Sequence, residues 1–479
     1  MTENIQTIVT EARKAAIGAQ QQWWSLTPRQ RFLIVRRIAA VLAAQHSALT
    51  AAVYRDVPAA EILATEVLPL ADACRFAGKS GPKILAPQSL SWFTAAWWLG
   101  RVSVTQRREP WGVVLVVAPW NYPLLLPGVQ IIQAIAAGNG VLVKPSPGCE
   151  AALHAFVKCL VSAGVPESLV QIIPSAIEAV DVAVESGVDK VVLTGSAATG
   201  RIVLHKLADQ LTPSTMELSG CDAVFVDPQA DLERTAKAIA YALVMNAGAT
   251  CIAPRRVFVT HDNCAKLGTL LIEELSDSRP RKLRPLIIEL AHSLVSQAVA
   301  DGAHILFGEM PDPVQGSMGP LVLADVRSEM NIAQADLFAP VTSLLSVDDL
   351  SQAVRDDAKC PYHLGASVFG PEPEASRWVK QINAGCVTIN DILVPTADPR
   401  VAFGGRGQSG WGLTRGAEGL LDMTRLKVVC RRHGRWMPHL DPKFSTDPRV
   451  LANLLKLFHA ASLAERLRSL ISLIRSGRK

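Results

Sequence analysis

The spacing of apolar residues changes along the chain. Residues 28–53, PRQRFLIVRRIAAVLAAQHSALTAAV, carry apolar residues at helical spacing from Phe32 to Val41, which predicts a long amphipathic helix. A second helix is expected over about residues 59–76. From residue 112 the pattern is different, because short β-branched runs alternate with alanine-rich segments of helical length. That alternation is typical of βαβ units around a buried parallel sheet.

Two series of these runs follow one another. The first, between residues 112 and 210, contains VVLVVAP, GVLVKPS, VQIIP and KVVLTGS. The second follows Cys251 and contains RRVFVT, AHILFG, TSLLSV, ASVFG and CVTIN. The runs are almost continuously apolar, as expected of strands that are covered on both faces. The sequence therefore predicts an α/β fold with two tandem doubly wound α/β domains.

Composition and cysteine usage are those of a globular protein from a reducing compartment. Hydrophobic residues make up 49% and charged residues 19% of the 479 positions. The nine cysteines include no C-x-x-C pair, which argues against a disulfide framework or a zinc site. The amino terminus has acids and no apolar signal-peptide core, and prolines interrupt the longest uncharged run, residues 110–143. A cytoplasmic protein without a bound metal is expected.

The net charge of +5 is unevenly distributed. Residues 431–479 contain eleven Lys or Arg and three Asp or Glu, so this tail carries +8 and the remainder carries −3. The body is therefore mildly acidic, and the basic character belongs to an appendage. An acidic body argues against nucleic acid as a partner.

Polar residues and glycines follow several predicted strands, where open α/β sheets bind ligands. Asn121 follows VVLVVAP and could donate to an oxyanion or cap the next helix. Lys144 ends the next run and could reach nucleotide hydroxyls or face solvent. In LTGSAATG, residues 193–200, the glycines would let the backbone approach a phosphate at a helix N-terminus, although this pattern alone is weak.

Two further residues carry reactive groups. Glu217 interrupts the apolar run MELSGCDAVFV, and a buried carboxylate is costly unless it is partnered or functional. The alternative is a glutamate at a strand end that faces solvent. Cys251 in NAGATCIAP is either a nucleophile on a loop or a small apolar residue in the interior. The two residues by themselves leave these alternatives open.

The order of the motifs carries more information than any one of them. P-W-N-Y-P, K-P-S, T-G-S-x-x-x-G, M-E-L-x-G, G-A-T-C and F-G-G-x-x-x-S-G follow one another along the chain. In this order and at these intervals they resemble the motifs of the aldehyde dehydrogenase superfamily, from about residue 20 to 430. LFAPV, residues 337–341, fits the same family. GATCIAP and the continuation past TRLKVV are most similar to its class-three-like branch.

The resemblance implies a role for each matching residue. Cys251 corresponds to the nucleophile, Glu217 to the general base, and Asn121 to the side chain that holds the oxyanion with the backbone N–H of Cys251. The aldehyde would become a carboxylic acid through a thiohemiacetal and a thioester on Cys251, with NAD or NADP accepting the hydride. The residues that would contact this cofactor are Trp120, Lys144, Ser146, Gly195, Ser196, Gly200, Asp336 and Phe338.

Two other functions fit the same fold. A reductase that acylates coenzyme A would release the thioester to a thiol, but such enzymes commonly lack the glutamate that Glu217 provides. A non-catalytic scaffold is the second alternative, and the presence of Cys251, Glu217, Asn121 and Lys144 argues against it.

Four positions depart from the family pattern. Ala249 replaces a frequent glutamine, while Ser219 and Ala339 replace glycines. Asp336 replaces a glutamate and is one methylene shorter, which puts its contact with the cofactor in doubt. None of these changes removes a catalytic group.

The resemblance also divides the chain. Residues 1–217 are expected to form a Rossmann-like cofactor domain and residues 218–410 the catalytic domain. A small β element that bridges subunits would use residues near 101–115 and return at 411–432. The basic amphipathic tail, residues 433–479, follows it. A homodimer is expected.

The tail and a tryptophan-rich stretch bear on partners and substrate. From Pro448 onward, leucines and isoleucines recur mostly at helical spacing among basic residues. This pattern is typical of a helix in a membrane interface, or of one that docks on the body or on a partner subunit. SWFTAAWWLG, with Trp92, Trp97 and Trp98, favours a hydrophobic aldehyde as substrate.

Overall fold

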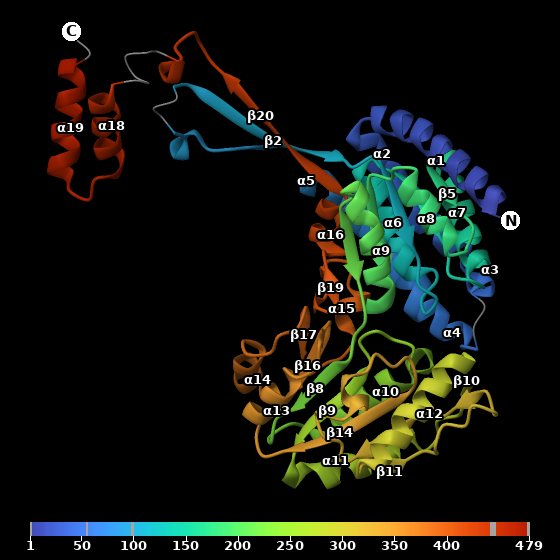
Figure 1. Cartoon of the computed structure of the whole chain (residues 1–479). Helices are drawn as coiled ribbons and strands as arrows, with labels where there is room; N and C mark the ends of the chain where they lie inside the picture. Colours follow the sequence, from blue (N-terminus) through green and yellow to red (C-terminus); the bar gives the residue numbers. More distant parts are fainter. Residues whose placement is uncertain (1, 54–55, 97–99, 441–446, 477–479) are drawn as a thin grey trace. The chain divides into compact units, whose positions relative to one another are not determined.

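The computed structural model describes residues 2–53, 56–96, 100–440 and 447–476. They form two compact units (Figure 1). The larger comprises Met1–Ile84 and Pro110–Arg425, and the smaller comprises Leu85–Glu109 and Leu426–Lys479.

A six-stranded sheet in the larger unit has the order β19-β7-β6-β3-β4-β5. Its strands are β3 (Val113–Val117), β4 (Gly140–Lys144), β5 (Val170–Ile172), β6 (Lys190–Thr194), β7 (Ser214–Glu217) and β19 (Gly410–Trp411). All neighbours are parallel except β19, which runs antiparallel to β7. The connecting helices are α6 (Leu125–Ala137), α7 (Glu150–Ala163), α8 (Glu178–Glu185) and α9 (Ala197–Gln210), with a 3-10 turn η4 (Glu167–Leu169). On one face, α8, α9 and α1 (Thr2–Ser25) cover the sheet.

A seven-stranded sheet has the order β11-β13-β14-β9-β8-β16-β17 and is parallel except at β11. Its strands are β8 (Asp222–Val226), β9 (Pro254–Thr260), β11 (His304–Phe307), β13 (Leu321–Ala324), β14 (Val341–Val347), β16 (Gly365–Phe369) and β17 (Cys386–Ile389). Its helices are α10 (Leu232–Val244), α11 (His261–Leu275), α12 (Pro285–Ala300), α13 (Leu350–Asp357) and α14 (Glu372–Val379).

Alternate strand residues of this sheet face opposite helix layers, as the pleat requires. Phe225 and Phe258 stack at 5.4 Å and pack with α12 and α13, whereas Val224 and Val257 pack with α10 and α11. Both faces are therefore buried, and the nearly continuous apolar runs are explained. The α/β fold with parallel sheets that was predicted from these runs is confirmed.

The amino-terminal helices differ from the prediction. They are α2 (Pro28–Ala44), α3 (His46–Ala52), α4 (Ala59–Ile62), a π-helical turn η1 (Leu63–Val67) and α5 (Leu68–Ile84). The single helix over residues 28–53 is wrong, because Gln45 has a non-helical backbone (φ −105°, ψ 18°). A capping box between Thr27 and Gln30 begins α2, and Phe32 is buried as its spacing predicts.

Short elements complete the larger unit. They are β10 (Arg281–Lys282), β12 (Ser317–Met318), β15 (Tyr362–His363), β18 (Arg406–Gly407), η5 (Met245–Gly248), η6 (Asn331–Gln334), α15 (Val394–Ala397) and α16 (Gly416–Asp422).

The smaller unit contains a three-stranded sheet of order β1-β2-β20. Its elements are β1 (Gln88–Ser89), η2 (Trp92–Thr94), β2 (Val102–Pro110), β20 (Thr424–Arg432), η7 (Pro438–Leu440), α18 (Pro448–His459) and α19 (Leu463–Ser476). The range 101–115 expected for a bridging element holds β2 but also β3, which belongs to the six-stranded sheet. Trp97 and Trp98 lie outside the described residues.

The tail contains two helices instead of the single one expected. The break is at Ala460, whose ψ of 140° is not helical. The helices α18 and α19 pack on each other, and Asn453 Nδ2 donates to Ser472 Oγ at 3.0 Å between them. Large apolar side chains stay exposed on both: Leu451, Leu455, Phe458, Leu463, Leu467, Leu470, Ile471 and Ile474.

Among the described residues, no single helix has the length and apolar character needed to cross a membrane. One bent pair, α2 with α3, passes on length and composition alone.

Candidate active site

Four predicted site residues lie along one edge of the six-stranded sheet. Asn121 follows β3, Lys144 ends β4, Gly195 follows β6 and Glu217 ends β7. Since these strands are parallel neighbours, their carboxyl ends meet at the same edge. This edge is where open α/β sheets bind ligands.

The loop before Cys251 has an unusual backbone. Asn246, Ala247 and Gly248 have positive φ values of 51°, 54° and 74°. Glycine is required at 248, because a Cβ there would lie 2.4 Å from Pro340 N. Left-handed non-glycine residues are strained and tend to occur at functional sites. The turn presents Cys251 half-buried just before β9.

Arg255, in β9, holds this loop in place. Its buried guanidinium donates to the carbonyls of Gly248 and Ala339, and to that of Thr250 at 3.4 Å. Burial lowers the pKa of Arg255 to about 10. This role could not be predicted from the sequence, because Arg255 and Arg256 are both buried and RRVFVT does not indicate which of them contacts the loop.

Asn121 lies against the same loop. Its Nδ2 donates to the Ala249 carbonyl at 3.0 Å, and Asn246 Nδ2 donates to the Asn121 carbonyl at 2.9 Å. Beside them, the hydroxyls of Tyr122 and Thr250 are 2.6 Å apart. The amide of Asn121 is thus fixed two residues from Cys251.

The helix-capping alternative for Asn121 is wrong. The first N–H groups of α6, at Leu124 and Leu125, donate to Glu66 Oε2 at 2.7 and 3.0 Å. Glu66 is fully buried and comes from η1, 58 residues before the first of them. A carboxylate so distant in sequence could not be assigned to this helix from the sequence.

Glu217 is buried, with 4% of its surface exposed, so the solvent-facing alternative is wrong. Its Oε2 accepts a hydrogen bond from Thr414 Oγ1 at 3.2 Å, while Oε1 has no partner among the described residues. Burial raises the pKa of Glu217, and the charge of Arg415 and the Thr414 hydrogen bond act in the opposite direction. A carboxylate with a raised pKa and a free oxygen is suited to accept a proton.

Cys251 and Glu217 line one cavity of about 210 Å³. The cavity wall is mainly apolar. Its lining residues come from η1, α5, α6, α10 and the segment from Ile392 to Phe403, among others. Besides Glu217, its charged lining residue is Arg415. Cys251 is therefore accessible from a substrate-sized space and is not a core cysteine.

The surroundings of Cys251 disfavour its thiolate. Burial raises its pKa well above the ordinary value, and the negative charges of Glu217 and Asp222 raise it further. Arg415 is the group that lowers it. Nucleophilic attack requires the thiolate, so the proton must be lost during the reaction.

The predicted cofactor residues on β3 and β4 lie nearby. Lys144 is buried, which lowers its pKa, and it takes part in no ion pair within the described ranges. Ser146 follows it and is half-buried. Trp120 has its ring 5.9 Å from that of Phe338 and 4.4 Å from the guanidinium of Arg284.

The turn between β6 and α9 contains the predicted phosphate-binding residues. Ser196 is the N-cap of α9 and accepts from Thr199 N at 3.1 Å. Gly200 is needed for packing, because a Cβ there would lie 2.8 Å from the Leu218 side chain. At Gly195 an added Cβ would make only an ordinary contact, so the fold itself does not require glycine there.

Asp336 lies close to Ser219, and both residues depart from the family pattern. Burial raises the pKa of Asp336, and the Ser219 side chain and the Gly220 backbone act in the opposite direction. Asp336 Oδ1 has no hydrogen-bond partner among the described residues. Ser219 Oγ also accepts from Ala197 N, in the first turn of α9, at 3.0 Å. The shortened carboxylate is thus held against Ser219.

Comparison with known proteins gives one family. The model of the aldehyde dehydrogenase family matches residues 2–429. A putative succinate-semialdehyde dehydrogenase [NADP(+)] 2 of Mycobacterium ulcerans is 28% identical, covering 94% of this chain and 88% of that protein. A 4,4'-diapolycopene aldehyde oxidase of Methylomonas sp is 29% identical, covering 76% of this chain and 70% of the other. The crystal structure of a Mycobacterium tuberculosis aldehyde dehydrogenase complexed with NAD+ has a TM-score of 0.83 at 25% identity, covering 89% of this chain and 91% of that one.

These findings confirm the superfamily. The class-three-like branch stays a prediction. The chain has two large, mainly parallel sheets, and the predicted site residues lie at the edge of one of them. Because the family model also matches residues 2–429, the chain belongs to the aldehyde dehydrogenase family.

Proposed function

We propose that this protein oxidises an apolar aldehyde to its carboxylic acid through a thioester on Cys251, which is hydrolysed with Glu217 as general base. The observation that carries the proposal is the shared cavity, which brings together a half-buried thiol and a carboxylate oxygen that has no partner in the described part of the chain, between apolar walls. This combination favours hydrolysis over transfer to coenzyme A.

The residues at the sheet edge fit a dinucleotide. Lys144 is a buried cation without an ion-pair partner among the described residues, and cofactor hydroxyls would supply acceptors. Gly195 is a glycine that the fold does not need, which suits close approach of a pyrophosphate. Trp120, Ser146, Ser196 and Phe338 complete this proposed site, and Gly200 and Asp336 support it through Leu218 and Ser219. When bound, the nicotinamide supplies hydride acceptance.

The proposed reaction uses four protein groups in sequence. Cys251 loses its proton to solvent, and its sulfur bonds to the aldehyde carbon while the C=O π bond opens to give a thiohemiacetal oxyanion. The Asn121 amide and the Cys251 backbone N–H donate to that oxygen. Loss of hydride converts the adduct to a thioester. Glu217 then takes a proton from water, and the resulting hydroxide adds to the thioester carbon. The C–S bond breaks, the acid is released, and the proton held by Glu217 returns to the sulfur of Cys251.

The cavity wall supports an apolar substrate. Pro69, Leu125, Leu126, Ile392 and Leu393 are among its lining residues. The two relatives described above carry different aldehydes in their names, so similarity alone does not choose between them. Each buried methylene is worth about 0.8 kcal/mol, so longer chains should gain affinity while they fit.

Turnover of a series of straight-chain aldehydes tests this. We expect kcat/KM to rise about fourfold for each added methylene until the cavity is filled. NADH or NADPH should form without coenzyme A. Succinate semialdehyde, which ends in a carboxylate, is the control and should be a poor substrate. A preference for the semialdehyde would contradict the apolar assignment, and a requirement for coenzyme A would contradict hydrolysis.

We also propose the domain boundaries, bridging element and homodimer expected above. Support for the dimer comes from β20, which is nine residues long and lies at the edge of the three-stranded sheet. Leu426 and Val428 on this strand are exposed. An exposed edge strand of this length offers backbone groups to a second chain.

For the tail we propose contact with an anionic membrane surface. The helices α18 and α19 leave eight large apolar side chains exposed, more than the scattered few of an ordinary surface. Exposed Arg449, Lys456, Arg468 and Arg475 accompany them. Apolar residues beside cations complement a layer of anionic headgroups over acyl chains.

Flotation with liposomes tests this contact. The full chain should float with anionic vesicles, less so at high salt, and a chain ending at Pro442 should not. Leu455→Glu with Leu467→Glu should abolish flotation. The matched control is Val314→Glu, which replaces an apolar side chain that is 93% exposed in the larger unit. Absence of flotation, with loss of oligomers on truncation, would show that the tail is a packing element.

A further inference from the structure

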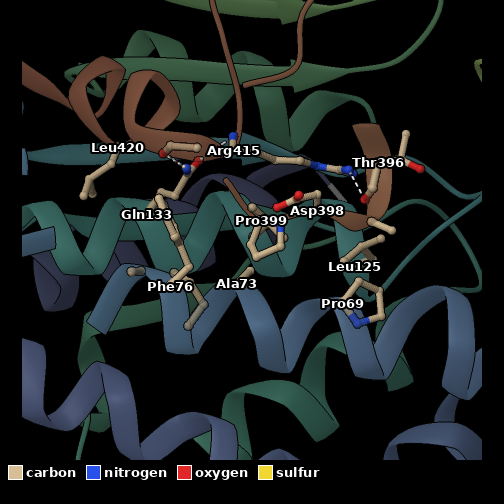
Figure 2. A pocket seen from close by; sticks show the side chains of 15 residues that line it. Pro69, Ala73, Phe76, Leu125, Gln133, Thr396, Asp398, Pro399, Arg415 and Leu420 are labelled. Atoms are coloured by element: carbon tan, nitrogen blue, oxygen red, sulfur yellow. Dashed lines mark hydrogen bonds between the residues drawn. The ribbon is translucent and has the colours of Figure 1, made fainter. Parts of the chain in front are cut away.

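Arg415 has a strained backbone. Its φ is 63° and its ψ is 175°, a region that is essentially restricted to glycine. The position is fixed by Gln133 of α6, whose Oε1 accepts from Arg415 N at 3.2 Å and whose Nε2 donates to Gly416 O at 3.4 Å (Figure 2). Strain of this kind persists only where the surrounding structure holds it, and it clusters at functional sites.

The side chain of Arg415 is buried without a counter-ion. Only 4% of the residue is exposed, and no ion pair within the described ranges includes it. Its Nη1 donates to the Thr396 carbonyl (Figure 2). Its guanidinium lies 5.5 Å from the Phe403 ring centre. Burying a guanidinium beside a ring and a neutral carbonyl is costly. Neither the fold nor a salt bridge explains why this residue is an arginine.

The location of Arg415 gives the explanation. It lines the cavity that holds Glu217 and Cys251. It also lines a smaller cavity of about 20 Å³ (Figure 2). The groups whose charges act on it are Glu217, Cys251, Cys386 and Tyr122. Two of these are the proposed base and nucleophile.

The effects of Arg415 on both groups have the same sign. Burial raises the pKa of Glu217 and of Cys251, and the positive charge of Arg415 lowers both. Of the other charges near Cys251, Glu217 and Asp222 raise its pKa. Burial raises the pKa of Asp222 itself well above its ordinary value. Arg415 is thus the cation that acts on both reacting groups.

We propose that Arg415 is a positioning residue whose charge keeps Glu217 able to accept a proton and assists loss of the Cys251 proton. The strained backbone at 415 directs this charge into the cavity. The inference rests on the proposed function, since it assigns Arg415 a role through Cys251 and Glu217.

Alkylation of the whole enzyme without substrate tests the effect on Cys251. The rate of iodoacetamide modification, measured by mass spectrometry at the Cys251 peptide, follows the thiolate fraction. Removing the charge raises the pKa, so the alkylation profile should move to higher pH. We expect Arg415→Met to react about tenfold more slowly at a fixed pH below the midpoint, a shift of about one unit. Arg415→Lys retains the charge and should stay within about threefold of the unmodified enzyme.

A second measurement reports on Glu217. The steady-state rate of aldehyde oxidation after the first turnover should require higher pH in Arg415→Met and should recover in Arg415→Lys. Arg400→Met is the control, because Arg400 is an exposed arginine of the neighbouring loop that pairs with Asp398. It should change neither profile.

Three outcomes would overturn the proposal. Unchanged pH profiles in Arg415→Met, with lower activity at all pH values, would show a merely structural role. Failure of both Arg415→Met and Arg415→Gly to fold would also show a structural role. Glycine relieves the strain at this backbone position, so misfolding of Arg415→Gly could not be attributed to the backbone. A shift of the pH profiles in Arg415→Lys as large as the shift in Arg415→Met would show that charge is not the property that matters. Failure of the proposed function itself would be distinct, because Cys251 of the unmodified enzyme could then be alkylated without loss of activity.

Discussion

Cys251→Ser is expected to fold normally and to lose aldehyde oxidation, with kcat/KM falling about 10³-fold or more. A hydroxyl is a far weaker acid than a thiol, and the buried position already raises the pKa of the Cys251 thiol. The proton would therefore stay on serine, and no adduct would form with the aldehyde. Initial rates of NADH formation, with thermal melting as a check of folding, measure the effect.

Cys386→Ser is the matched control for this change. Cys386 is also a half-buried free cysteine, and its charge is among those that act on Cys251. Because it lies outside the residues that line the cavity with Cys251, its replacement should leave turnover within a few-fold. Turnover by Cys251→Ser within about tenfold of the unmodified enzyme would mean that another group is the nucleophile.

Glu217→Gln is expected to separate the two halves of the reaction. Gln keeps the shape of the side chain and an oxygen for the Thr414 hydroxyl, but it cannot take a proton from water. Rapid mixing should show a burst of about one NADH per active site, followed by a steady state at least about 10²-fold slower than normal. The trapped species should be a thioester on Cys251, visible as added mass on its peptide.

Glu66→Gln is the matched control for Glu217→Gln. It removes another buried carboxylate close to the site but keeps one oxygen for the N–H groups of α6. Thermal stability should fall, and the ratio of burst to steady state should not change. If Glu217→Gln showed no burst, Glu217 would act before hydride transfer, as the base that removes the Cys251 proton.

Much of the fold follows from local sequence patterns. The apolar runs predicted strands such as β3, β6 and β9 because strands covered on both faces need such runs. The breaks between consecutive helices were harder to predict. Nothing in AAQHSA marks Gln45 as a helix end, since no glycine or proline stands there. In the tail a signal was present, because Ser462 and Glu465 have the S-x-x-E spacing that is typical of a helix start.

The candidate active site, too, could be predicted only in part. Asn121 and Glu217 stand in recognisable motifs at the ends of parallel strands, so their convergence could be predicted from the fold. Cys251 precedes β9 of the other sheet, and only the family resemblance placed it beside them. Their partners could not be predicted. Glu66 acts on a helix far along the chain, and Arg415 points into the cavity because of a backbone angle. Such features depend on tertiary packing, which local periodicity does not encode.

The contact between Ser219 and Asp336 has an energetic consequence. Gly220 cannot vary, because a Cβ there would lie 2.3 Å from the Cys251 carbonyl, but position 219 accepts a side chain. Glycine at 219 would remove the acceptor of Ala197 N and the Ser219 side chain that acts on Asp336. Glutamate at 336 would place a longer carboxylate near Ser219. We therefore expect the two positions to be energetically coupled, so that the cost of changing both differs from the sum of the two single changes.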